Sequence, residues 1–255
     1  KELPLVSLRV RRMALSGGQV GMLGCFAGDP NFPIAARELV SPPDLLGALC
    51  TLVLAIEGGA DALPAQLQSR IEPNGDSDRF LSLARILDGA KGNGLIILGQ
   101  SAVNHPEAAG LRAAATVLAE ITDSQVGWIH PNNSAAAWWS GAVPHRLPGG
   151  AKPAVEGANA QSMTELDLDT VVLFGLEPAL DHADPASLNK LLARARSVIS
   201  FNAFRSGVPD QARIALPIAP YTESSGTFLN CNGKMQFSRA AIKSQGNSRP
   251  GWKIL

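Results

Sequence analysis

Residues 94–129, GLIILGQSAVNHPEAAGLRAAATVLAEITDSQVGWI, decide the fold. The apolar run Leu95 to Leu98 is typical of a strand that is buried on both faces of a parallel sheet. A helix is expected from about His105 to Ile121, with Asn104 as its N-cap, and a second strand from Gln125 to Ile129. A strand, a helix and a strand in this order predict parallel pairing, with the helix crossing one face of the sheet.

The same alternation continues on both sides of this stretch. Further strands are expected at 20–26, 170–174 and 198–201, and helices at 5–15, 41–57, 78–87, 134–139 and 185–195. Two helix starts have clear cap signals, Ser41 before Pro42-Pro43 and Asp184 before Pro185. We therefore expect a three-layer α/β sandwich with a Rossmann-like parallel sheet. Its predicted parts are a partial first lobe at 1–89, a second lobe at 90–220 and an extended tail at 221–255.

Composition excludes several classes of function. The 22 basic and 22 acidic residues give a net charge of zero, which argues against a nucleic-acid surface. The longest strongly apolar run, Leu45 to Ile56, is too short to cross a bilayer, so no direct membrane insertion is expected. Cys25, Cys50 and Cys231 form no CxxC pair. Only 17% of residues are charged, which fits either a surface partly covered by other protein or an Ala- and Gly-rich chain with few charges.

A search for catalytic motifs yields no assignment. Gly92-Asn93-Gly94 precedes a strand, whereas a phosphate-binding turn would follow one, and 149–152 lacks the spacing of a P-loop. No GxSxG or HxxxH pattern is present. A few side chains could still form a polar crevice or a stacking site, although turn chemistry and packing explain them better. They are His130, Glu177, Asn202, the Trp138-Trp139 pair and Cys25. We therefore expect no catalytic, cofactor-binding or metal-binding residue.

The segment 221–236 reads YTESSGTFLNCNGKMQ. Glu223, Thr227 and Asn230 are placed to bond backbone groups in its turns, so the segment could be entirely structural. It also resembles a motif of the molybdopterin oxidoreductase superfamily, which includes formate dehydrogenase. The residues that match the motif are Glu223, Gly226, Thr227, Asn230, Gly233 and Gln236. Asn232 and Lys234 stand where that family usually has glutamate and arginine, which weakens any role in contacting a pterin.

Four further segments match one branch of the superfamily, in the same order along the sequence. They are KELPLVSLRVRR at 1–12, GLIILGQSAVNHPEAAGL at 94–111, VVLFGLEP at 171–178 and RPGWKIL at 249–255. Together they resemble the large iron–sulfur subunit of bacterial complex I, the NADH:quinone oxidoreductase.

This resemblance implies a structural, non-catalytic region without a cofactor, in a subunit that takes part in electron transfer from NADH to quinone. The iron–sulfur cysteines of that subunit lie in amino-terminal domains outside this sequence, so we expect an internal piece of a longer protein. The implied partners are other subunits of the peripheral arm, on the cytoplasmic side of the inner membrane. In the family the first lobe is inserted into the second, so the first lobe should lack the strand that precedes Lys1.

Two alternatives remain open. The region could belong to an active molybdopterin-dependent oxidoreductase of the formate dehydrogenase type, in which loops at the strand ends cradle the cofactor. It could also be a free-standing Rossmann-like binding module, although the dinucleotide fingerprint is missing.

Overall fold

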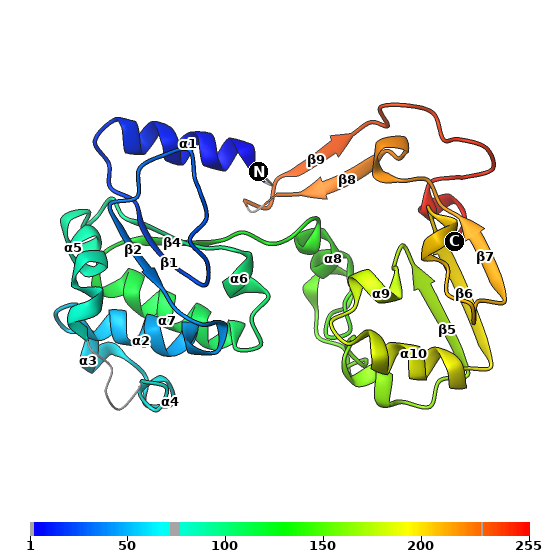
Figure 1. Ribbon diagram of the computed structural model, residues 1–255, viewed down its shortest axis with the longest axis horizontal. Coiled ribbons are helices and arrows are strands. Elements are labelled where there is room, and N and C mark those ends of the chain that lie inside the picture. The colour runs from blue at the N-terminus through cyan, green and yellow to red at the C-terminus, as the bar shows by residue number, and fades with distance from the viewer. Residues whose placement is uncertain (1–2, 72–76, 231) are drawn as a thin grey trace. The chain divides into compact units, whose positions relative to one another are not determined.

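A computed structural model describes residues 3–71, 77–230 and 232–255 (Figure 1). The protein forms two compact units, Lys1–Pro131 and Asn132–Leu255. The boundary therefore follows residue 131, whereas the sequence predicted a lobe boundary near residue 89. A core that residues 1–89 share with residues 90–131 explains this difference.

The first unit is an alternation of strands and helices. Its strands form two separate parallel pairs, β1 with β2 and β3 with β4. The elements are α1 (Pro4–Leu15), β1 (Gly21–Gly24), β2 (Ala36–Leu39), α2 (Leu45–Leu54), α3 (Gly59–Ala62), α4 (Ala65–Gln68), α5 (Leu81–Gly89), β3 (Leu95–Leu98), α6 (Gln100–Val103), α7 (Ala108–Ile121) and β4 (Gln125–Trp128). The predicted helices and strands are confirmed to within a few residues, and β2 and the short helices α3, α4 and α6 are additions.

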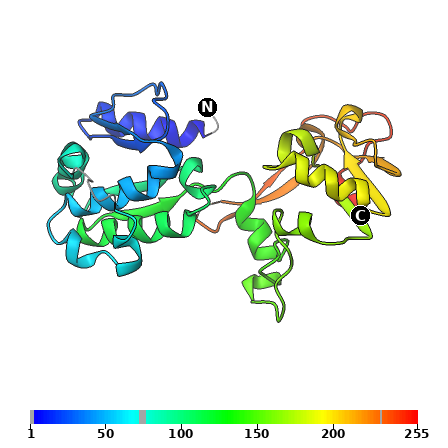
Figure 2. The ribbon, with the colours of Figure 1, turned by 60° about the horizontal axis from the view of Figure 1, so that its bottom comes forward.

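The core of the first unit is built around α2, which is buried on nearly every side and packs against α7 (Figure 2). Leu111 and Leu118 of α7 are each 1% exposed and belong to the same cluster as the buried leucines of α2. Gly110 allows the close approach, because a Cβ atom there would lie 2.8 Å from Cδ2 of Leu46. Residues 90–131 thus share one core with residues 1–89, and the two predicted lobes are not separate at this point.

Three local expectations in this unit are wrong. The side chains of Ser41 and Asn104 make no N-cap hydrogen bond; the Ser41 hydroxyl donates to the Asp44 carboxylate instead. The strand Leu95–Leu98 is not buried on both faces. Leu98 is 8% exposed, but Leu95 and Ile97 are 58% and 39% exposed on the other side of the strand. A continuous apolar run does not reveal which of its faces is covered.

The second unit contains a three-stranded parallel sheet in the order β5-β6-β7 and an antiparallel hairpin, β8-β9. Its elements are α8 (Ser134–Ser140), β5 (Thr170–Phe174), α9 (Pro178–Asp181), α10 (Pro185–Arg194), β6 (Ser197–Asn202), β7 (Ile214–Pro217), β8 (Gly226–Leu229) and β9 (Met235–Ser238). The expected cap of α10 is confirmed, because the Ser187 N–H donates to Oδ1 of Asp184 at 3.0 Å.

One face of this sheet is covered by α10. Leu188, Leu191 and Leu192 of the helix form a buried cluster with Val171, Leu173 and Val198 of the strands. The opposite face carries Val172, Phe174 and Ile214, which are 51%, 46% and 48% exposed. The protein is thus confirmed as an α/β protein with small parallel sheets. In the described part of the chain these sheets are separate, whereas one Rossmann-like sheet was expected for the second lobe. None of the helices described combines the length and the hydrophobicity that a bilayer crossing requires.

Candidate functional site

The motif segment 221–236 folds into a short 3₁₀ turn, Tyr221–Glu223, followed by the β8–β9 hairpin. At the tip of the hairpin, Oδ1 of Asn230 accepts hydrogen bonds from the N–H groups of Asn232 at 3.0 Å and Lys234 at 2.9 Å. Gly233 has φ +73°, a left-handed conformation that glycine adopts at little cost. The amide of Asn230 and the freedom of Gly233 together close the turn.

Glu223 fixes the other end of the motif. Its Oε2 accepts a hydrogen bond from the Gln245 N–H at 2.9 Å, and the Ala241 N–H bonds the carbonyl of Thr222 at 2.8 Å. The carboxylate of Glu223 therefore holds the 241–245 segment against the turn. A side chain engaged in this way is an anchor within the fold.

The remaining motif residues lie on the strands of the hairpin. Gly226 is opposite Ser238, Thr227 is opposite Phe237, and Gln236 is opposite Phe228. The backbone carbonyl of Thr227 accepts a hydrogen bond from a side chain outside the hairpin, and Gln236 is exposed. A structural role for the motif as a whole remains a prediction.

Asn133 binds the hairpin from outside, and sequence reasoning missed it. Its Nδ2 donates to the carbonyl of Thr227 at 2.8 Å, and its Oδ1 accepts from the Leu229 N–H at 3.0 Å. One side-chain amide thus bonds β8 as the backbone of a neighbouring strand would. Asn133 immediately precedes α8, where Asn is a common cap residue, so its partners 94 and 96 residues away leave no local signal.

The structure brings together two of the predicted strand-end residues, Glu177 and Asn202. Both side chains pack on Gly207, where a Cβ atom would lie 2.6 Å from Cδ of Glu177 and 2.7 Å from Nδ2 of Asn202. Asn202 is 7% exposed, and its Oδ1 accepts from the Phe204 N–H at 2.9 Å. Its Nδ2 is buried without a hydrogen-bond partner among the residues described. This edge therefore presents one free amide donor beside one carboxylate.

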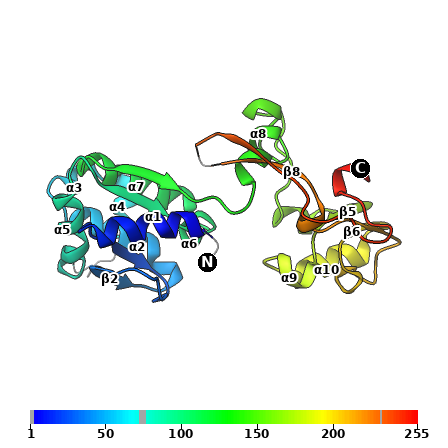
Figure 3. The ribbon, with the colours of Figure 1, turned by 90° about the horizontal axis from the view of Figure 1, so that it is seen from above.

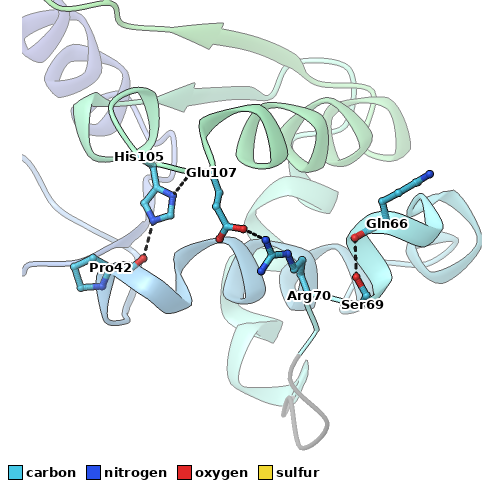
Figure 4. A network of polar contacts seen from close by, with 6 residues as sticks. All are labelled: Pro42, Gln66, Ser69, Arg70, His105 and Glu107. Carbon is cyan, nitrogen blue, oxygen red and sulfur yellow. Dashed lines mark hydrogen bonds and ion pairs between the residues drawn. The ribbon is translucent and has the colours of Figure 1, made fainter. Parts of the chain in front are cut away.

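His130 belongs to the first unit, whereas Glu177 and Asn202 belong to the second. Two other histidines form hydrogen bonds with backbone groups of nearby loops. Nε2 of His105 donates to the carbonyl of Pro42 at 2.9 Å, while its Nδ1 accepts from the Glu107 N–H at 3.0 Å (Figure 4). Glu107 also forms an ion pair with Arg70. His182 bonds backbone groups through both ring nitrogens. His105 and His182 thus stabilise loops.

The tryptophan pair and the cysteines show no sign of a binding or catalytic role in the described structure. Trp138 packs on Gly150 and lies under the guanidinium group of Arg146, 5.2 Å from the ring centroid. Cys25 is half-buried, and Cys50 is fully buried. Burial raises the pKa of the Cys50 thiol from 9.0 to about 11, an effect that Arg70 partly offsets. A thiol with a raised pKa is a poor nucleophile. Cys231 lies outside the described residues.

The described residues form no acid–base pair or metal-ligand group at the strand ends. They contain no cluster of three His, Cys, Asp or Glu side chains suited to a metal ion. Two surface hollows of about 390 and 480 Å³ are found elsewhere. The first is lined by Asp29, Pro30, Phe32, Ile34 and Arg37, and the second by Ser225, Gly226, Thr227, Phe237, Ser238 and Trp252.

Comparison with known proteins gives a consistent picture. A family model described as molybdopterin oxidoreductase matches residues 12–255. The G subunit of the NADH-quinone oxidoreductase of Mycobacterium tuberculosis is 29% identical over 174 residues, which cover 58% of this chain and 21% of the relative. The G subunit of the Streptomyces coelicolor enzyme is 34% identical over 109 residues, covering 43% of this chain and 12% of the relative. The mitochondrial NADH-ubiquinone oxidoreductase 78 kDa subunit of Neurospora crassa is 50% identical over 44 residues, 17% of this chain and 6% of the relative. The protein thus spans about a fifth of the length of the first of these relatives.

Proposed function

The chain belongs to the molybdopterin oxidoreductase family, and on that premise we propose that it is a structural, non-catalytic region of the G subunit of an NADH-quinone oxidoreductase. The observation that carries the proposal is the agreement between the family match over 12–255 and the relatives, which are G subunits of this enzyme. The whole protein then takes part in electron transfer from NADH to quinone, while this region serves as scaffold.

The geometry of the motif supports a scaffold role. Oε2 of Glu223 and Oδ1 of Asn230 accept hydrogen bonds from backbone N–H groups of this chain. These bonds hold the turns of the motif in place, which is what a structural role requires. The low fraction of charged residues fits a surface that other protein covers in part.

The family name implies a molybdopterin cofactor, and on our proposal this region does not hold one. The described residues offer no metal-ligand cluster, and neither surface hollow is lined by Glu177 or Asn202. We therefore assign no step to molybdenum in this region. On our proposal the iron–sulfur clusters of the parent subunit are held by segments beyond residues 1–255.

The finer features of the architecture and the assembly are also proposals. We infer that the short parallel sheets are parts of a three-layer, Rossmann-like arrangement that is completed by other segments of the parent protein. The partners are other subunits of the peripheral arm, and the location is the cytoplasmic side of the inner membrane, without insertion. The names of the relatives support an assembly of this kind.

Affinity purification of the full-length parent protein from its native host tests the proposal. The tagged protein should copurify from detergent-solubilised membranes with NADH:quinone oxidoreductase activity. The molybdenum content of the same sample, measured by mass spectrometry, should be zero. The variant Asn230→Ala should lower the amount of assembled complex, because it opens the hairpin turn. Asn247→Ala is the matched control, since Asn247 is an exposed asparagine in another turn. A soluble protein with about one molybdenum or tungsten atom per polypeptide would contradict the proposal.

A second candidate function is part of an active molybdopterin oxidoreductase, and the free amide of Asn202 favours it. A buried donor without a partner is costly, and a ligand atom that accepts from it would remove the cost. Glu177 lies beside the amide and could accept from the same ligand. The molybdenum measurement separates the two candidates.

A further inference from the structure

Helix α1 contacts its own unit along one face. Ala14 on this face is buried, the Ser7 hydroxyl donates to Oδ1 of Asn31 at 3.4 Å, and the guanidinium group of Arg11 donates to the Asn31 carbonyl. Figure 3 looks onto α1, and no other described element of the first unit lies in front of it. The opposite face of the helix is therefore open in the described part of the unit.

The open face carries large apolar side chains at a regular spacing. Leu5, Leu8 and Leu15 are 73%, 43% and 64% exposed, and the exposed Arg12 lies between the last two. The steps from residue 5 to residues 8, 12 and 15 are three, four and three, which is the order of the a and d positions of a heptad. We call Leu5, Leu8, Arg12 and Leu15 the α1 seam. Single exposed leucines are common on soluble proteins, but a row at this spacing is the surface that one helix presents to another.

The α1 seam is basic at its centre and along both sides. With Leu5 and Arg12 at a positions, Arg9 takes an e position and Arg11 a g position. The charges at e and g select the partner of a coiled coil. Pro4–Leu15 contains no acidic residue, and neither Arg9 nor Arg12 takes part in an ion pair among the residues described. A helix that packs on the α1 seam therefore meets positive charge wherever it could form an ion pair.

We propose that the α1 seam docks an acidic amphipathic helix of a partner protein. The partner helix has apolar residues at its own a and d positions and Asp or Glu side chains opposite Arg9 and Arg12. The proposal rests on the proposed function in one respect, namely that the parent protein is a subunit of a larger assembly. It adds the surface and the chemistry of one contact in that assembly.

The distribution of charge argues against two other occupants. A second copy of α1 would bring arginines against arginines, and like charges across an interface repel. A lipid surface fits less well, because a membrane-surface helix separates its charged face from its apolar face. Arg12 instead lies within the apolar row, where a carboxylate of a protein partner can pair with it.

The size of the α1 seam shows what kind of contact it makes. Its ten residue steps rise about 1.5 Å each, so the row is about 15 Å long. Two helices of this length are marginal as an isolated pair in water. Helix α1 is already held in place by its own unit, through Ser7, Arg11 and Ala14. The partner helix should likewise belong to a folded subunit, and the contact should form part of a larger interface.

Photo-cross-linking in the full-length protein within its assembled complex tests the proposal. Benzoylphenylalanine placed at the position of Leu8 should cross-link to a helix of another subunit. That helix should carry apolar residues at heptad spacing with Asp or Glu beside them. Cross-links only to the parent polypeptide, to a second copy of α1 or to lipid would overturn the proposal, and so would the absence of cross-links.

Charge reversal gives an independent readout. Arg12→Glu should weaken the association of the subunit with the complex by more than about tenfold, because it places like charges opposite each other. Arg85→Glu is the matched control, since Arg85 is an exposed arginine on α5 of the same unit. Replacing the cross-linked carboxylate with arginine should restore the association of Arg12→Glu, which a mere loss of folding would not allow. Equal effects of Arg12→Glu and Arg85→Glu, or a failure of this rescue, would overturn the proposal.

The identity of the complex is scored separately, by its NADH:quinone oxidoreductase activity. A parent protein that joins this complex without the expected cross-links contradicts the present inference alone. One that joins a different complex through the α1 seam contradicts the proposed function alone, and one that joins no complex contradicts both.

Discussion

Replacing Asn133 with alanine should loosen the β8–β9 hairpin without unfolding the second unit. The substitution removes two hydrogen bonds, from Nδ2 to the Thr227 carbonyl at 2.8 Å and from the Leu229 N–H to Oδ1 at 3.0 Å. A hydrogen bond of this kind contributes about 1 kcal/mol, so the loss is about 2 kcal/mol. The population of open hairpin should rise by about 30-fold.

Amide hydrogen exchange of Leu229 is the direct assay, because its N–H donates to Asn133 in the folded state. Its exchange rate should rise by about 30-fold, while that of Phe201 in the central strand β6 stays constant. Asn133→Asp keeps an acceptor for Leu229 and loses the donor to Thr227, so its effect should be about half as large in free energy. An unchanged Leu229 rate in Asn133→Ala would refute the idea that this amide acts as a strand neighbour.

Three other substitutions or conditions test the core, a thiol and a helix cap. Leu111→Ala in α7 should destabilise the first unit by about 3 kcal/mol in denaturant unfolding, about a hundredfold, because Leu111 is 1% exposed. Leu5→Ala, at a position 73% exposed, should change stability by less than about 0.5 kcal/mol, and similar effects for the two would argue against the assigned core. Native Cys50 should resist alkylation at pH 8 while Cys25 reacts. Since the pKa of Cys50 is raised to about 11, the unfolded state loses its proton first, and stability should fall by about 1.4 kcal/mol per pH unit between pH 9 and 11. Asp184→Ala should fray the start of α10 and lower the helix content measured by circular dichroism. Lowering the pH should have the same effect on the wild-type protein. The hydrogen bonds from Ser187 lower the pKa of the Asp184 carboxyl, so its stabilisation is complete above the ordinary pKa of 3.8, declines as the pH falls below that value and is gone below the lowered pKa. An α10 insensitive to both changes would contradict the assigned cap.

Much of the secondary structure could be predicted because its signals are local. The apolar run at 95–98, the periodicity of α7 and the Asp184-Pro185 start of α10 each lie within a few residues of the element that they specify. The strand β2 escaped prediction because Ala36–Leu39 contains Arg37 and Glu38, and four residues are too few to show a pattern. The division into units also escaped, because it depends on the packing of α7 on α2.

The candidate site was less predictable for the same reason. Local rules placed Asn230 and Gly233 in a turn, and the structure shows the bonds of that turn. They could not show that Asn133 reaches Thr227, or that Glu177 and Asn202 meet over Gly207, since these contacts join distant segments. Burial of the Asn202 amide without a partner is likewise a property of the packed unit.

The bond between Asn133 and β8 constrains the order of events during synthesis. Its two partners lie 94 and 96 residues later, so the ribosome must complete most of the second unit before that contact can form. The ribosome adds about 5–20 residues per second, so roughly 5–20 seconds pass between the synthesis of Asn133 and that of its partners. The first unit by then has its full sequence available and can build its own core. The first unit should therefore acquire structure before the second, and the hairpin and the residues after it should complete the second unit last.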